Sequence, residues 1–313
     1  MGTAIEWTDT VWNPVTGCNK VSEGCRNCYA FALHDMRHKS FTEGKKLPRQ
    51  YAKPFSEIQL FPERLEQPLK WRKPRRIFVN SMSDLFHEDV PEGFIGSVWD
   101  VMARTPRHTY QILTKRPERM QELLSKWADD GWYWRREYGM WCGPLTGPLP
   151  NVWLGVSVEN QKAADERIPL LLQTPAAVRF LSCEPLLGPV DLEFTAQFEH
   201  PDNEGYGVTA IKGIDWVIVG GESGPNARPM HPEWVRGLRD QCEDYGVPFF
   251  FKQWGEWMKV PPSRKPWEYG SPEEKVSFVG DARFYRIGKK KAGRLLDGRE
   301  WNEIPTVPPT SAN

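Results

Sequence analysis

The sequence predicts an α/β fold, a partial parallel barrel with a C-terminal extension. Short apolar runs, each four to six residues long and rich in Val, Ile and Phe, alternate with helical stretches. Continuous apolar runs of this length are typical of strands buried on both faces of a parallel sheet. The alternation favours βα units with right-handed crossovers. About seven such strands are too few for a closed eight-stranded barrel and suit a partial one.

The predicted strands follow one another along the chain, and most end in glycine or polar side chains. They lie in segments 11–17, 76–84, 109–116, 151–160, 178–185, 215–224 and 247–255. Because the carboxyl ends of parallel strands meet at one edge of a sheet, we expect these polar residues to converge there.

Helical patterns fill the gaps between the strands. The predicted helices lie in 91–104, 116–128, 159–174 and 231–246. In the first, apolar residues recur at the spacing of one helix face, and Pro91 suits the first helical position. Gly246 suits a C-terminal cap, and Pro169 predicts a break or kink.

Two segments depart from this alternation. Segment 129–150 is aromatic and then rich in glycine and proline, which predicts an inserted lid or binding loop. From residue 256 the alternation stops, and 275–288 is typical of a hairpin. We therefore expect a partial barrel over 1–255, which carries the insertion, and a C-terminal hairpin with a basic tail over 256–313.

Bulk composition limits the classes of function. The 313 residues include 41 basic and 41 acidic ones, so overall charge gives no signal for nucleic acid. Basic stretches 70–76 and 286–294 are candidates for phosphate contacts and the aromatics of 132–141 for base stacking, although such runs are more often solvated faces. The start is polar and no long apolar run occurs, so we expect a cytoplasmic protein without membrane contact.

Three of the six cysteines lie close together: Cys18, Cys25 and Cys28. In the cytoplasm, clustered cysteines favour metal or redox chemistry over disulfides. A structural zinc site needs a fourth ligand, for which His34 is the nearest candidate. An iron–sulfur cubane held by three thiolates leaves one iron open to a small molecule. Structural or free thiols are the third interpretation, and the spacing alone leaves all three open.

The cysteine loop lies just after the first predicted strand, at the edge where functional residues of such folds gather. In this the chain resembles the radical S-adenosylmethionine (SAM) superfamily, whose partial (β/α)6 barrels carry a three-cysteine loop after the first strand. The first gap here is longer than the commonest spacing in that superfamily, and an aromatic residue, Tyr29, follows the third cysteine. Segments 80–92, 112–117 and 154–160 resemble strand ends of its spore photoproduct lyase-like branch.

Over its whole length the chain resembles most closely an uncharacterised, phage-associated three-Cys-motif family. The matching segments are EWTDTVWNPVTGC, GCRNCYA, SMSDLFH, LTKRPERM, LSCEPLLGP, VGGESGPNARPM, FFFKQWGEW and AGRLLDGREW. The chemistry we expect is the one that the radical SAM resemblance implies.

That resemblance implies a mechanism. Cys18, Cys25 and Cys28 would hold a [4Fe-4S] cluster, and the amino and carboxylate groups of SAM would bind its open iron. One electron, from a donor such as flavodoxin or ferredoxin, would cleave the sulfonium and yield a 5′-deoxyadenosyl radical that abstracts hydrogen from the substrate. A nucleic acid or a nucleotide is the substrate class we favour.

Further roles follow from position in such a barrel. The residues assigned to SAM are Ser81, Ser83, Asp84, Ser157, Glu159 and Arg167. The first three would lie near the methionine amino group, the next two near the ribose hydroxyls, and the arginine would pair with the SAM carboxylate. For each, the alternative is a residue with local hydrogen bonds only.

Three more candidates lie at later strand ends. Glu222 follows paired glycines and, with Arg228, is a candidate to contact SAM or substrate. The alternative is that this glycine-rich segment only forms a tight turn. The segment lacks the Gly-x-Gly-x-x-Gly motif of dinucleotide-binding proteins. Cys183 is either a buried small hydrophobe or, as the resemblance allows, a thiol that donates hydrogen to a substrate radical. Lys252 follows three phenylalanines, which favours a contact to substrate or phosphate.

Two rival functions remain. A non-catalytic zinc or iron–sulfur nucleic-acid-binding module predicts a colourless, zinc-loaded protein that leaves SAM intact. A hydrolase that uses Asp84, His87 and Glu88 with a divalent metal predicts activity that survives replacement of Cys25.

Overall fold

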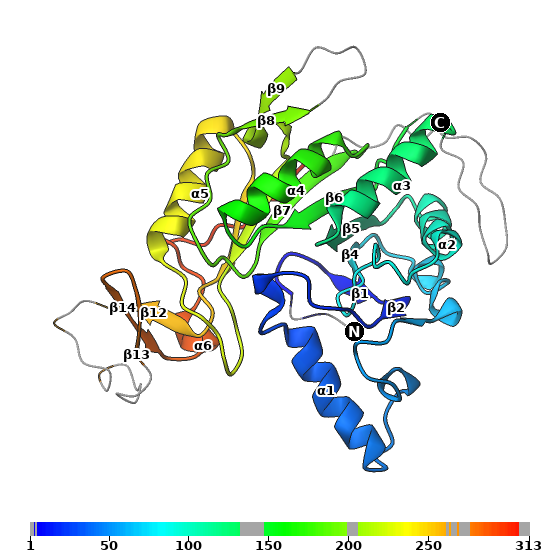
Figure 1. Ribbon diagram of the computed structural model, residues 1–313, viewed down its shortest axis with the longest axis horizontal. Helices are drawn as coiled ribbons and strands as arrows, with labels where there is room; N and C mark the ends of the chain where they lie inside the picture. Colours follow the sequence, from blue (N-terminus) through cyan, green and yellow to red (C-terminus); the bar gives the residue numbers. More distant parts are fainter. Residues whose placement is uncertain are drawn as a thin grey trace. The chain divides into compact units, whose positions relative to one another are not determined.

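A seven-stranded sheet forms the centre of the computed structural model, which describes residues 3, 5–131, 147–198, 206–260, 263, 268 and 276–306. The strand order is β1 (Thr10–Trp12), β4 (Arg76–Val79), β5 (Thr109–Thr114), β6 (Val152–Ser157), β7 (Val178–Cys183), β10 (Trp216–Gly220) and β11 (Phe249–Gln253) (Figure 1). Each strand overlaps a predicted segment. Order in space equals order in the chain, which is the arrangement of a partial parallel barrel and confirms the predicted fold class.

The strands are buried on both faces, as their composition predicts. All six residues of β6 and all five of β10 are buried. Strand pairs run parallel, for example Thr10 opposite Ile77 in β1 and β4. The register of β10 on β11 shifts between Val219 and Gly220, so the carboxyl end of β10 is irregular.

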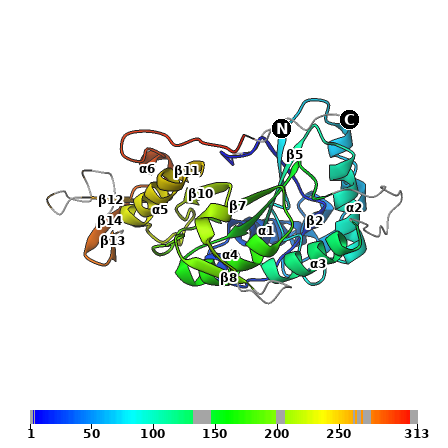
Figure 2. The same ribbon diagram turned by 90° about the horizontal axis from the view of Figure 1, so that it is seen from above.

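Helices connect the successive strands of the sheet, except between β7 and β10. They are α1 (Tyr29–Thr42), α2 (Glu92–Ala103), α3 (Pro117–Asp129), α4 (Gln161–Gln173) and α5 (Pro232–Tyr245). Gly246 ends α5 with a φ of 67°, which confirms the predicted cap. Helices α2 and α3 lie side by side in Figures 1 and 2, with the Trp99 and Trp127 rings in edge contact at 5.5 Å.

Two helix details differ from the sequence prediction. Pro91 lies at the N-cap with an extended ψ of 144°, so α2 begins one residue later. Pro169 lies inside α4 and does not break it, while the kink predicted as the alternative to a break stays a prediction. Ala164, Ile168 and Leu171 form a fully buried stripe at helical spacing, and its burial offsets the hydrogen bond that the proline removes.

The described residues also form smaller antiparallel sheets. Strand β2 (Val15–Thr16) pairs with β3 (Gln59–Leu60), β8 (Thr195–Phe198) with β9 (Tyr206–Thr209), and β14 (Ala282–Arg286) with both β12 (Trp257–Lys259) and β13 (Val276–Val279). Strands β13 and β14 confirm the predicted hairpin, whereas β8 and β9 have no counterpart in the sequence prediction. Single 3₁₀ turns lie at Glu23–Cys25, Arg49–Tyr51, Pro62–Arg64, Pro68–Lys70 and Ala210–Gly213, and helix α6 is Lys289–Ala292.

The chain divides into two compact units. Unit 1 holds the described residues up to Val156 together with Leu170–Arg179, and unit 2 holds Ser157–Pro169 and the described residues from Phe180 onward. The boundary predicted after residue 255 stays a prediction, and residues 132–146 of the predicted insertion lie outside the described residues. Over the described part of the chain, no helix is long and apolar enough to span a membrane.

Candidate functional site

In unit 1, the first cysteine follows a glycine that the fold requires. Gly17 has a φ of 101°, and a Cβ there would lie 2.3 Å from the carbonyl oxygen of Glu57, so only glycine fits. Gly17 forms an isolated parallel bridge with Ser83, just beyond the end of β4. The Cys18 amide donates to the carbonyl of Phe55 at 2.8 Å. Cys18 is therefore held beside the carboxyl end of β4.

The other two clustered cysteines lie on the turn that leads into α1. Cys25 ends a 3₁₀ turn, and Cys28 is the N-cap of α1. The Cys28 amide donates to the Cys25 carbonyl at 3.3 Å. Cys18, Cys25 and Cys28 are all free and half-buried. Among the residues that the structure describes, no three His, Cys, Asp or Glu side chains are arranged around one metal position.

Asp84 joins the cysteine loop to the end of β5. Its carboxylate accepts hydrogen bonds from Thr114 Oγ1 at 2.7 Å and from the amides of Phe86 and Lys115 at 3.0 Å each. Arg116 Nη1 lies 3.2 Å from Asp84 Oδ2 and 3.8 Å from Cys18 Sγ. These contacts bring together the predicted residues Cys18 and Asp84 with an arginine that the sequence prediction missed.

The Cys18 thiol is protonated at neutral pH in this environment. Burial, reinforced by the negative charge of Asp84, raises its pKa to about 11, and the opposing effect of Arg116 is smaller. A coordinated metal deprotonates a thiol outright, so metal binding here would release a proton.

The two serines predicted for SAM have local partners. Ser81 Oγ donates to Asn13 Oδ1 at 3.2 Å, and Ser83 Oγ donates to the Val15 carbonyl at 2.9 Å. The Tyr29 hydroxyl donates to the Ser81 carbonyl at 2.6 Å. These bonds tie the end of β4 to the β1–β2 connection and to the start of α1, and each serine oxygen keeps lone pairs for a further donor.

His34, the candidate fourth zinc ligand, is fully buried on α1. Its Nε2 lies 2.9 Å from the Lys53 carbonyl, and its ring packs 4.9 Å from the Phe55 ring. Among the residues of the rival hydrolase, His87 Nδ1 accepts the Asp89 amide at 3.1 Å, and burial lowers the pKa of His87. Neither residue belongs to a described metal-ligand group.

In unit 2, the residues predicted for the ribose and the SAM carboxylate lie together. Arg167 Nη1 on α4 contacts Glu159 Oε2 at 2.8 Å and the Ser157 carbonyl at 2.7 Å. Both side chains of the ion pair are almost fully buried. The structure therefore joins Ser157, Glu159 and Arg167 at the carboxyl end of β6.

Lys252 forms an ion pair across a neighbouring strand. Its Nζ lies 3.0 Å from Glu184 Oε1, and Ser182 Oγ donates to the other carboxylate oxygen at 3.2 Å. Strand β10 lies between β7 and β11, and a Cβ at Gly220 would come within 2.8 Å of Glu184 Oε1. Glycine at this position therefore leaves room for the carboxylate to reach the lysine. The pair is mostly buried, with the lysine side chain 20% exposed.

Cys183 has a different environment. It is fully buried, and burial raises its pKa, with the nearby Cys242 thiol of α5 adding to the shift. Because successive strand residues point to opposite faces, Cys183 faces α5 while Ser182 and Glu184 face the other side. Its environment is that of a packed small side chain, and its role as a hydrogen donor stays a prediction.

The glycine-rich segment after β10 closes on itself. Glu222 accepts from the Arg228 guanidinium at 2.7 and 2.9 Å and from the Arg228 amide at 2.8 Å. A Cβ at Gly221 would lie 2.1 Å from the Trp254 carbonyl oxygen. Paired glycines permit another backbone to approach closely. At Gly221 it is the Trp254 backbone of the same chain that does so.

The two basic stretches, 70–76 and 286–294, each have contacts within their own unit. Segment 70–76 leads into the amino end of β4, and Arg107 donates to the carbonyls of Pro68, Leu69 and Trp71. In unit 2, Arg286 donates to the carbonyls of Gly224 and Pro225. Lys290 and Lys291 of α6 are exposed and lie within the second stretch.

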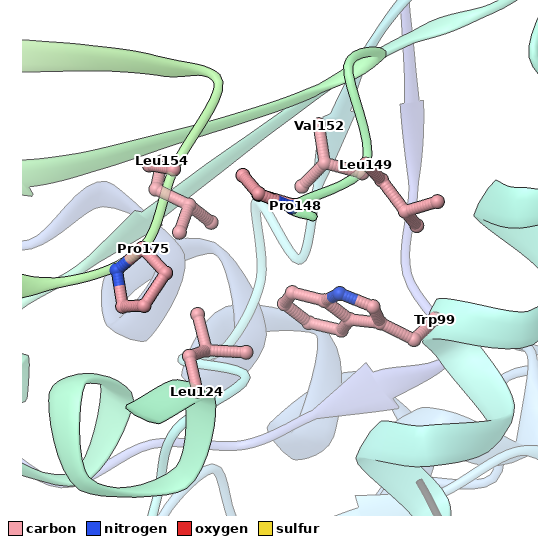
Figure 3. Close-up of a pocket in the computed structure, with 8 residues that line it drawn as sticks. Trp99, Leu124, Pro148, Leu149, Val152, Leu154 and Pro175 are labelled. Carbon is pink, nitrogen blue, oxygen red and sulfur yellow. The ribbon is translucent and has the colours of Figure 1, made fainter. Parts of the chain in front are cut away.

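A small apolar cavity in unit 1 is unrelated to these polar groups (Figure 3). It is lined by Trp99, Leu124, Pro148, Leu149, Val152, Leu154, Pro175 and Ala176. These residues include the first residue of β6, whereas the cysteine loop lies beside the carboxyl end of β4. The lining carries no group suited to proton transfer or metal binding, so the cavity is a packing void.

Comparison with known proteins identifies the family. A family model matches residues 2–305. The chain belongs to the DUF5131 family. Its description reads "Protein of unknown function". No curated protein matches the chain. A solved structure, "Spore photoproduct lyase complexed with dinucleoside spore photoproduct", is similar at 11% identity and a TM-score of 0.31, with 87% of this chain and 66% of that chain covered.

Proposed function

We propose that the chain is a radical SAM enzyme acting on a nucleic acid or a nucleotide. One observation carries the proposal: three free, half-buried thiols, Cys18, Cys25 and Cys28, lie on one loop beside the carboxyl end of β4. The loop belongs to the first βα unit of a parallel sheet in sequential order. This is the position that the sequence resemblance to the superfamily implies.

The donor set fits a [4Fe-4S] cluster better than a closed zinc site. Zinc in a structural site takes four protein ligands, and the loop itself supplies only three cysteines. Three thiolates fit a cubane with one iron left open. Cys28 at the N-terminus of α1 adds a favourable dipole for a thiolate.

When bound, the cluster and SAM supply one-electron cleavage of the sulfonium bond, with an electron from a donor such as flavodoxin or ferredoxin. The chain's own residues bind and orient. Within unit 1, Ser81 and Ser83 carry oxygen lone pairs suited to the ammonium of SAM. Glu159 and Arg167 of unit 2 form a buried ion pair with each other, and their contacts to the ribose and the carboxylate stay a prediction. Lys252, held by Glu184, is the candidate for contact with an anionic substrate.

Anaerobic reconstitution with iron and sulfide tests the cofactor. We expect about four irons per chain, and 5′-deoxyadenosine after addition of dithionite and SAM. Cys25→Ala should lose both, whereas Cys242→Ala, which removes a buried thiol of α5 outside the loop, should keep both. A colourless protein that holds zinc and leaves SAM intact would instead support the non-catalytic nucleic-acid-binding module.

Fluorescence anisotropy with a labelled single-stranded oligonucleotide tests the substrate class. Binding through phosphates weakens as salt rises, so we expect a clear loss of affinity between low and physiological salt. The double variant Lys290→Ala/Lys291→Ala should bind more weakly, and Lys162→Ala, which removes an exposed lysine on α4, should bind normally. No binding by the wild type at low salt would contradict a nucleic-acid substrate. A free nucleotide would then be the remaining substrate class.

A further inference from the structure

Arg116 is a charged group in contact with a cysteine of the loop. It is the last residue before α3, and its Nη1 lies 3.8 Å from Cys18 Sγ, within the range of a hydrogen bond to sulfur. Its side chain is 13% exposed. Cys25 Sγ, by contrast, lies 3.6 Å from the neutral hydroxyl of Ser22. The loop therefore has an asymmetric environment, with the Arg116–Asp84 ion pair beside one sulfur and the guanidinium of that pair in contact with it.

The fold fixes the guanidinium in this position. Asp84 is 5% exposed and accepts from Thr114 Oγ1 and two backbone amides as well as from Arg116. The Arg116 amide in turn donates to Thr114 Oγ1 at 2.9 Å. A carboxylate with so many donors cannot rotate freely, so it holds the guanidinium in one orientation. The arrangement is prepared before any ligand binds.

A fixed cation beside a cluster sulfur has a defined effect. Hydrogen bonds to cluster sulfurs and nearby positive charge favour the reduced, more negative state and so raise the reduction potential. Arginine keeps its charge at every accessible pH and donates from a planar group. We propose that Arg116 is a positioning residue that donates a hydrogen bond to the Cys18 thiolate and makes the bound cluster easier to reduce. This inference rests on the proposed function.

A potentiometric titration of the reconstituted cluster, followed by electron paramagnetic resonance, tests the inference. For Arg116→Gln we expect unchanged iron content and a reduction equilibrium about tenfold less favourable, which is about 59 mV for a one-electron couple. Arg116→Lys keeps the charge and should recover part of the shift. Arg119→Gln is the matched control, because Arg119 donates to the carbonyls of His87 and Val90; its potential should equal that of the wild type.

A second measurement needs no substitution and is independent of folding defects. Wild-type protein labelled with ¹⁵N in its arginine side chains should show a weak ¹⁵N coupling to the reduced cluster in pulsed resonance spectra. Absence of that coupling, or an Arg116→Gln cluster at the wild-type potential, overturns the inference while the proposed function stands. A wild-type chain that takes up no cluster overturns the proposed function, and the inference with it.

Discussion

Gly221 lies where two backbone segments of unit 2 cross, and its replacement by alanine should destabilise the protein. The Gly221 amide donates to the Gln253 carbonyl at 2.8 Å, and Gln253 Nε2 donates to the Gly221 carbonyl at 2.7 Å. A Cβ at Gly221 would lie 2.1 Å from the Trp254 carbonyl oxygen and 2.5 Å from its carbon. The crossing is reciprocal, since a Cβ at Gly255 would lie 2.2 Å from the Glu222 carbonyl oxygen.

The size of the effect follows from this geometry. Real Cβ contacts essentially never fall below 3.0 Å, so one backbone must move by about an ångström. The obstacle is a main-chain carbonyl, which cannot swing aside as a flexible side chain can. Overpacking costs about 1–3 kcal/mol, and we expect the upper end, about 3 kcal/mol. For a unit of this size that lowers the Tm by about 6–12 °C.

Thermal unfolding followed by circular dichroism measures the change. Gly237→Ala is the matched control, because Gly237 lies inside α5 and a methyl group added there would meet nothing within 4 Å. Alanine there should stabilise the helix by about 0.5–1 kcal/mol. A Gly221→Ala protein that unfolds at or above the wild-type temperature would refute the reasoning from the backbone crossing.

Two further predictions concern stability. Hydrogen bonds from Arg236, opposed by partial burial and reinforced by Arg239, lower the pKa of Asp297 to about 2. Because this folded-state pKa lies below the unfolded value, the stabilisation is present above about pH 4 and is lost as the pH falls through 2. Asp297→Asn should therefore cost about 1 kcal/mol at pH 7, since the carboxylate is partly exposed, and clearly less near pH 2, where the carboxyl group is about half protonated; urea unfolding at both pH values measures it, and an equal cost at both would contradict it. Leu124→Ala enlarges the apolar cavity in unit 1 and should cost about 3 kcal/mol in the same assay. Leu295→Ala, at a side chain 56% exposed, should change stability by less than about 0.5 kcal/mol, and equal effects would show that the cavity does not matter.

The elements of the sheet were predictable because the strands are built on short apolar runs that alternate with helical patterns along the chain. The five buried residues of β10 and the six of β6 stand out from the helical patterns between them without any knowledge of their neighbours. Pro169 shows where local propensity is not enough. Propensity predicts a break or a kink there; the helix is not broken, because burial of one face of α4 is a tertiary property that outweighs the proline.

The candidate site was predictable only in part. The cysteine spacing and the acidic strand ends are visible in the sequence, so Cys18 and Asp84 could be chosen. Arg116 could not, because nothing in its local sequence selects it over Lys115 or Arg119 as the partner of Asp84. One signal was available: Asp84 and Arg116 follow neighbouring strands of a parallel sheet, whose ends meet at one edge.

What the amino-acid sequence determined by itself is the set of elements and the chemistry of the residues at their ends. Burial of an apolar run or capping by Gly246 depends on residues a few positions apart, so it can be read locally. Only the tertiary structure decided which groups contact one another. Arg116 and Cys18 are 98 residues apart in the chain, and Lys252 reaches Glu184 because Gly220 of the strand between them has no side chain. Such pairings depend on the register of whole strands, and register is a property of the folded sheet.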